Sequence, residues 1–143
     1  MQFTCSEINK ISKYKLTEQT KSVKKALFYI MIETVHARLS VLRFSINIGH
    51  DADTIALHFS PRFNSNVIVC NSKQGDWGAE HREPCFPFQQ GEEFKLSITF
   101  NNDTFNIKLP GGTMMSFPNR FGDDVFKHIH VMGDVKITSI KIK

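Results

Sequence analysis

Cysteine, tryptophan and long apolar runs are all scarce in this 143-residue chain. The three cysteines, Cys5, Cys70 and Cys85, are odd in number and form no C-x-x-C pair, which argues against a disulfide framework and a structural zinc site. We therefore expect free thiols and a reducing compartment. The longest apolar run, ALFYIMI at 26–32, is too short to span a bilayer, so no membrane insertion is expected. The opening MQFTCSEINKISK has no apolar core, which predicts that there is no signal peptide.

Most of the chain has no excess of positive over negative charge. The formal net charge is +4, but residues 1–43 carry eight Lys/Arg and three Asp/Glu, or +5, whereas residues 44–143 carry ten and eleven, or −1. The basic residues of the first segment form no helical stripe or tight cluster, which a nucleic-acid site would need. We interpret them as scattered solubilising charges and expect no nucleic-acid partner.

From residue 44 onward, the chain places apolar residues at every second position. In DTIALHFSPRFN, one face carries Ile55, Leu57, Phe59 and Phe63 and the other is mostly polar, which predicts a half-buried strand. Pro61 falls on the apolar face. Because proline donates no backbone hydrogen bond, it predicts a break or an edge position there.

The same alternation recurs toward the C-terminus. FKLSITF at 94–100 and TFNIKL at 104–109, joined by NND, predict a hairpin. PGG at 110–112 predicts a turn before another short strand, TMMSF. VKITSIKIK at 135–143 shifts parity at Thr138 and Ser139, which predicts a bulge or bend.

Two segments depart from this pattern. GDDVFKH at 122–128 predicts one short helical turn, and SVKKALFYIMIETVHARLSV at 22–41 fits either an amphipathic helix or two strands. Elsewhere, short strands recur at regular spacing without βαβ alternation or internal repeats. The chain is therefore expected to be a single all-β domain, a sandwich or a barrel.

Polar side chains on the outward strand face form a candidate site. His58, Ser60 and Arg62 project from one strand, about 7 Å apart per step. The next segment, SNVIVCN, is expected to return beside them, and it brings further polar and aromatic groups: Asn71, Trp77, Glu80 and Arg82. An aromatic plate beside directional polar groups suits a sugar, which has an apolar C–H face and hydroxyls at its rim. A solvated face with incidental ion pairs is the alternative.

These motifs resemble the galectins, the β-galactoside-binding lectins, whose pattern is H-x-N-x-R, V-x-N and W-x-x-E-x-R. The matching segments are HFSPR at 58–62, VCN at 69–71 and WGAEHR at 77–82, with flanks RFSINIG, REPCFPFQQGE, KLPGG and FPNR. The resemblance implies a jelly-roll β-sandwich of two antiparallel sheets, with the sugar on the concave sheet. We assign residues 29–143 to a galectin-like carbohydrate-recognition domain and residues 1–28 to an atypical basic segment.

The resemblance also implies roles and partners. Trp77 would stack on galactose, His58 and Arg62 would bond its axial O4, and Asn71 and Glu80 would bond O6. Arg62, Glu80 and Arg82 would reach the next sugar, and Ser60 belongs to the same carbohydrate site. No metal or other cofactor is implied. The expected partners are β-galactoside glycans and glycoproteins, with a homodimer through edge strands. Cytoplasmic residence, with export that bypasses the secretory route, is expected.

The sequence departs from the galectin pattern at two places. Ser60 stands where galectins usually carry Asn, and one lost hydrogen bond costs about 0.5–1.5 kcal/mol, or about three- to tenfold in affinity. Weakened rather than absent binding is therefore expected. ETVHARLSVLRFSIN lacks the Gly and Pro that usually precede the RF-x-I-N segment. The N-terminal residues therefore either form strands from an unusual sequence or make a substitute extension.

Two other functions compete with that of a lectin. One is a structural or protein-binding galectin-like domain whose sugar site is weakened or lost, which Ser60 favours. The other is a glycosidase, which usually needs two carboxylates about 5–10 Å apart. The outward face offers Glu80 alone, because Glu83 has the opposite parity. No enzymatic activity is therefore expected.

Overall fold

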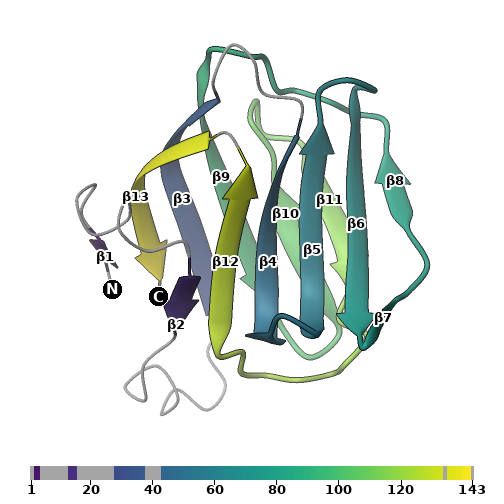
Figure 1. Ribbon diagram of the computed structural model, residues 1–143. Helices are drawn as coiled ribbons and strands as arrows, with labels where there is room; N and C mark the ends of the chain where they lie inside the picture. Colours follow the sequence, from purple (N-terminus) through teal and green to yellow (C-terminus); the bar gives the residue numbers. More distant parts are fainter. Residues whose placement is uncertain (1, 4–12, 16–27, 38–42, 134, 143) are drawn as a thin grey trace.

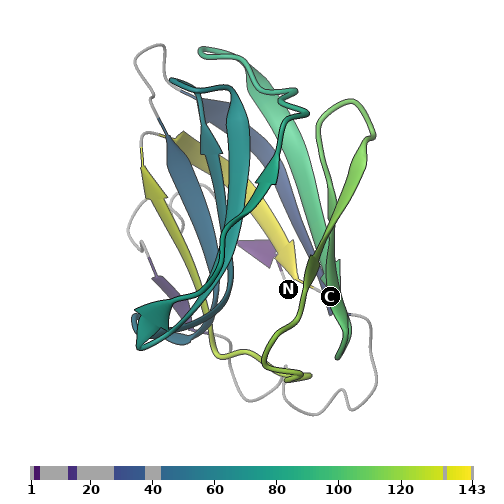
Figure 2. The ribbon, with the colours of Figure 1, turned by 90° about the vertical axis from the view of Figure 1, so that its right-hand side faces the viewer.

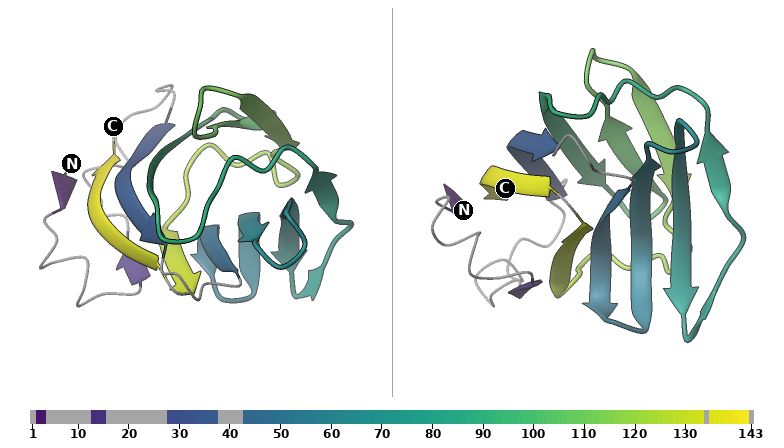
Figure 3. Two further views of the ribbon diagram at one scale, coloured as in Figure 1. Left: turned by 90° about the horizontal axis from the view of Figure 1, so that it is seen from above. Right: turned by 45° about the horizontal axis from the view of Figure 1, so that its top comes forward.

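The computed structural model describes residues 2–3, 13–15, 28–37, 43–133 and 135–142 (Figure 1). Over these residues the chain is all β, with two antiparallel sheets packed face to face and no helix (Figures 1 and 2). The expected β-sandwich is thus confirmed. Views from above and at an angle show both sheets curving around a shared interior (Figure 3).

One sheet has six strands and carries no predicted site residue. Its order is β1 (Gln2–Phe3), β13 (Val135–Ile142), β3 (Phe28–Ala37), β9 (Glu93–Phe100), β10 (Thr104–Lys108) and β11 (Met114–Pro118). The predicted hairpin is present, with Phe105 opposite Phe100 and Ile107 opposite Ile98. The strand expected from TMMSF is β11, which pairs with β10.

The other sheet has seven strands and carries the candidate site. Its order is β2 (Lys13–Lys15), β12 (His128–Gly133), β4 (Phe44–Asp51), β5 (Thr54–Arg62), β6 (Val67–Gln74) and β7 (Asp76–Trp77), with β8 (His81–Glu83) also paired to β6. The turn at 63–66 that returns β6 beside β5 ends at Asn66, whose φ of 49° is one that Asn tolerates better than most residues. As a result, His58 lies opposite Asn71 across the strands.

Phenylalanine side chains fill the space between the sheets. The rings of Phe44, Phe88 and Phe94 lie together, with centroids 4.8 to 5.9 Å apart. Phe100 and Phe126 form part of a second group, 5.0 Å apart. Each buried ring stabilises the fold by roughly 1.5–3 kcal/mol relative to exposure. This packing holds the outward face of the seven-stranded sheet in a fixed shape.

Of the two alternatives predicted at Pro61, the break is confirmed and the edge position is wrong. β5 lies between β4 and β6, and Pro61 pairs with Ile68 of β6. On the β4 side, the continuous pairing ends at Phe59 and is followed by a single bridge between Arg43 and Arg62. The sheet therefore accommodates proline by interrupting one ladder.

The predicted helical turn at 122–128 is also wrong, and hydrogen bonds explain why. In a helix, the Lys127 amide would donate to the carbonyl of Asp123. Here that carbonyl accepts a bond from Asn119 Nδ2 (2.8 Å), and the Lys127 amide donates to Gly49 O (2.9 Å). Contacts from distant segments thus hold this stretch in an irregular path.

The predicted bulge at Thr138 and Ser139 is absent from the β13 ladder, which keeps one register against β3. The irregularity lies instead in β3, between Ile32 and Val35, where β3 pairs with β9. Of the two interpretations of 22–41, the described part, Phe28–Ala37, is a strand. The strands β1 and β2 pair with β13 and β12, so the N-terminal residues extend both sheets despite their unusual sequence.

Candidate functional site

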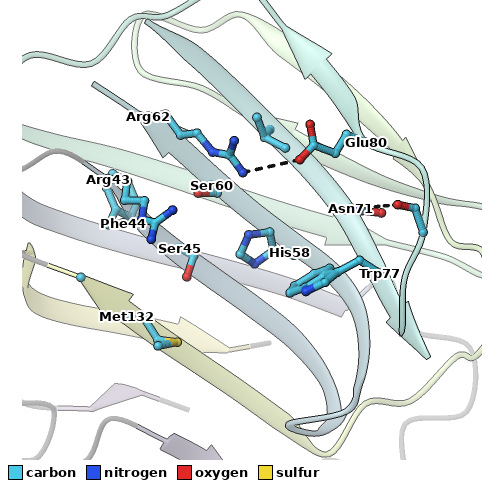
Figure 4. Close-up of a pocket in the computed structure, with 13 residues that line it drawn as sticks. Arg43, Phe44, Ser45, His58, Ser60, Arg62, Asn71, Trp77, Glu80 and Met132 are labelled. Carbon is cyan, nitrogen blue, oxygen red and sulfur yellow. Dashed lines mark hydrogen bonds and ion pairs between the residues drawn. The ribbon is translucent and has the colours of Figure 1, made fainter. Parts of the chain in front are cut away.

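A groove of about 790 Å³ crosses the outward face of the seven-stranded sheet, over β4, β5, β6 and β12. Six of the seven predicted residues line it: His58, Ser60, Arg62, Asn71, Trp77 and Glu80. Figure 4 shows the first three along β5, with Trp77 at one end and Glu80 facing Arg62. The seventh residue, Arg82 on β8, is not in the lining but contacts Glu80.

His58 is held as a neutral hydrogen-bond acceptor. Its Nδ1 bonds to Oδ1 of Asn47, the residue opposite it on β4. Because an amide oxygen only accepts, Nδ1 carries the proton and Nε2 is left as an acceptor. Burial, followed by the charges of Arg62 and Arg43, lowers the pKa of His58 to about 4. At neutral pH the imidazole is therefore uncharged.

Arg62 and Glu80 on the groove wall form a chain of charges with Arg82, which lies beside the groove. Glu80 Oε1 lies 3.7 Å from Arg62 Nη2, and Glu80 Oε2 lies 2.9 Å from Arg82 Nη2 and 3.2 Å from Arg82 Nε. The Arg62 Nε is buried and has no hydrogen-bond partner among the described residues. Partly exposed ion pairs add little stability. Their effect here is to orient donors and acceptors toward the groove.

Trp77 stands at one end of the groove with half of its surface exposed, at 50%. Its ring centroid lies 4.8 Å from that of His58, and Lys73 Nζ lies 5.5 Å from the ring centre. A large exposed indole on a strand beside polar groups is a flat platform for an apolar surface. Trp77 is therefore available to a ligand.

The Asn71 amide is fixed by its neighbours. Its Nδ2 donates to Gly78 O (2.9 Å), and its Oδ1 accepts from the Ser72 amide (2.8 Å) and from Arg120 Nη1 (3.2 Å). The groove thus combines a neutral acceptor, charged donors, one carboxylate, one amide and an aromatic plate. These groups can hold a neutral polyhydroxylated ring by paired hydrogen bonds and stacking.

Comparison with known sequences identifies the family to which the chain belongs. The family model described as galactoside-binding lectin matches residues 30–142. The chain belongs to the galactoside-binding lectin family. This lectin is 45% identical to galectin-1 of Mus musculus over 102 residues, which are 68% of this chain and 76% of the mouse protein.

Solved structures agree with the fold of the lectin. CG-16, a homodimeric agglutinin from chicken liver, matches with a TM-score of 0.75 and 36% identity over 81% of this chain and 90% of that chain. Congerin II, solved with lactose and MES, matches with a TM-score of 0.77 and 34% identity over 92% of this chain and 94% of that chain. The sandwich is thus the galectin sandwich.

Ser60 is the one polar position in the lectin's groove where its sequence departs from the galectin pattern. Its side chain is 3% exposed and lines the groove. The hydroxyl therefore lies at the groove wall, but it reaches less far than a carboxamide.

Sequence reasoning missed two residues that act on the site. Asn47 sets the His58 tautomer, and its position as an outward polar residue in RFSINIG was the available signal. Arg120 follows β11 of the opposite sheet, and nothing in the sequence pattern connects it to Asn71. Only the fold brings Arg120 and Asn71 together.

Two further features of the lectin concern metals and membranes. Within the described ranges, no group of three or more His, Cys, Asp or Glu side chains could hold a metal ion. His128 and His130, which both lie on β12, therefore belong to no such group in the described part of the chain. No helix long and apolar enough to cross a bilayer occurs in the part of the chain that the structure describes.

Proposed function

We propose that this lectin binds β-galactosides of the lactose and N-acetyllactosamine type in the groove over β4, β5 and β6, without catalysis. The observation that carries the proposal is the half-exposed Trp77 ring beside the neutral His58 acceptor and the Arg62–Glu80 pair. A galactose ring has an apolar face for the indole and an axial hydroxyl for the imidazole and the guanidinium.

Each group has a role set by its hydrogen-bonding capacity. His58 Nε2 accepts from the axial O4 hydroxyl, to which Arg62 donates. Asn71 and Glu80 bind O6, and Arg62, Glu80 and Arg82 reach glucose or N-acetylglucosamine. Trp77 packs on the C–H face of galactose. The lactose in the congerin II structure supports this ligand class.

The number of carboxylates in the groove supports binding without turnover. Glu80 is the one carboxylate among the described residues that line it. Glycoside hydrolysis usually requires two carboxyl groups on either side of the bond. The family, moreover, is one of lectins.

A lactose titration followed by the fluorescence of Trp77, the single tryptophan, tests the proposal. We expect a saturable change with lactose and none with sucrose, because sucrose contains no galactose. A folded protein that gives no change up to about 100 mM lactose would contradict the proposal, because that concentration would saturate a site with a Kd of about 1 mM. A structural or protein-binding role would then take first place.

Ser60 is the observation that favours this second role, and its replacement measures how far the site is weakened. We expect Ser60→Asn to tighten lactose binding about three- to tenfold, because a carboxamide adds one hydrogen bond. Calorimetric titration of both proteins measures the change, with Ser60→Ala as the matched control that removes the hydroxyl. Unchanged affinity in Ser60→Asn would show that this position makes no contact with the sugar.

The partners would be galactoside-bearing glycoproteins, and a homodimer would present two grooves that cross-link them. The similarity to CG-16, a homodimeric agglutinin, supports the dimer, which light scattering would detect as twice the chain mass. Cys70 and Cys85 are unpaired in the described part of the chain, which suits residence in the cytoplasm before export. Secretion that persists when the classical pathway is blocked would support such export.

A further inference from the structure

Arg120 lies behind the groove rather than in it. It follows β11 in the six-stranded sheet, and its guanidinium carbon sits 4.8 Å from the centre of the Phe117 ring. The segment from β11 to β12 passes beside β7 along one end of the sandwich (Figure 1). Arg120 is absent from the groove lining, so a sugar in the groove is not expected to touch it.

From this position Arg120 donates three hydrogen bonds to the back of the site. Its Nη1 donates to Asn71 Oδ1 (3.2 Å) and to Ser72 Oγ (2.9 Å), and its Nη2 donates to the carbonyl of Ala79 (2.8 Å). Two of these acceptors belong to β6 and the third to the loop between Trp77 and Glu80. One planar guanidinium therefore ties two separate parts of the groove wall together.

These bonds decide which way the Asn71 amide faces. The Ser72 amide and Arg120 can only donate, so the atom that meets both must be the amide oxygen. Its two lone pairs are then filled. On the nitrogen, one hydrogen goes to Gly78 O and the other remains. Asn71 can therefore offer the groove a donor but no acceptor.

We propose that Arg120 is a positioning residue for galactoside specificity: it holds Asn71 as a donor, so that the groove selects a sugar with a hydrogen-bond acceptor at C6. The proposal rests on the proposed function, because it takes Asn71 as the partner of O6. Without Arg120, one lone pair of the Asn71 oxygen is free and the amide loses a restraint. The preference for a 6-hydroxyl over a 6-deoxy sugar then weakens.

Gly78 shows how closely the guanidinium fits. A Cβ added there would lie 2.8 Å from Arg120 Nη1 and 3.3 Å from Asn71 Oδ1. Any side chain at residue 78 would therefore force Arg120 Nη1 to shift and would crowd Asn71 Oδ1, which disturbs the contact between them. Gly78→Ala is thus a second way to disturb the same contact without removing the charge.

The test compares lactose with lactose that lacks the 6-hydroxyl of its galactose, by Trp77 fluorescence, for wild type and Arg120→Met. For wild type we expect a tenfold or greater preference for lactose, roughly the effect of losing the bonds of the 6-hydroxyl to Asn71 and Glu80. Arg120→Met should reduce that preference to threefold or less, and Arg120→Lys should restore part of it. Lys95→Met, a charge loss at an exposed position on β9, should leave it unchanged.

The outcomes separate this proposal from the function on which it rests. Wild type that binds neither sugar contradicts both. Wild type that binds lactose without a 6-hydroxyl preference, or Arg120→Met that weakens both sugars equally, overturns the positioning role alone. If Arg120→Met does not fold, Gly78→Ala gives the same comparison, and an unchanged preference there overturns the proposal.

Discussion

Replacing Trp77 with alanine should weaken lactose binding by roughly 30- to 150-fold while leaving the fold intact. The indole is the exposed aromatic ring among the described residues that line the groove. Stacking of a ring on an aromatic side chain contributes about 2–3 kcal/mol at the upper end of measured values. Because half of the ring is exposed, its removal opens no large core cavity. Isothermal titration calorimetry measures the affinity, since no tryptophan remains to report on binding.

A matched control separates stacking from a general loss of apolar surface. Met114 on β11 is 57% exposed and lies outside the groove lining, so Met114→Ala should keep wild-type affinity and melting temperature. A Trp77→Ala protein that binds lactose within threefold of wild type would show that the indole is not the sugar platform. The proposed arrangement of the ligand would then be wrong.

The alternating segments of the sequence predict most of the sandwich. In FKLSITF, all four positions expected to face inward are buried: Phe94, Leu96, Ile98 and Phe100. The reason is that the inward face of a strand in a sandwich packs against the opposite sheet. Alternation does not say which neighbour a strand has. Pro61 could therefore be assigned to an edge, although it lies in a central strand whose ladder to β4 is interrupted.

Sequence reasoning failed where the deciding contact is distant in the chain. GDDVFKH reads as a helical turn locally, but Asn119 and Gly49 take the hydrogen bonds that such a turn needs. The sequence reveals the row of His58, Ser60 and Arg62 on β5, because the spacing of a strand alone places these residues on one face. Arg120 could not, because its contact with Asn71 spans 49 positions and joins the two sheets.

The second large effect on affinity is expected at Arg62, where Arg62→Met should lower the affinity for lactose by about a hundredfold or more. Hydrogen bonds from a charged donor contribute about 1.5–3 kcal/mol each, and in the proposed complex Arg62 donates both to O4 and to the next sugar. Methionine preserves much of the apolar stem but donates nothing. Glu80 keeps its contact with Arg82, so the carboxylate stays paired.

Stability should respond in the opposite direction from affinity. The Arg62 Nε is buried and has no partner in the described part of the chain, and an unsatisfied buried donor costs about 1–3 kcal/mol. We therefore expect Arg62→Met to melt at the same temperature as wild type or higher, whereas Arg62→Lys keeps the charge but loses the paired geometry. Calorimetry and thermal melts on both variants measure these effects. A Met variant that binds lactose normally would contradict the ligand role of Arg62, and one that melts well below wild type would contradict the expected effect on stability.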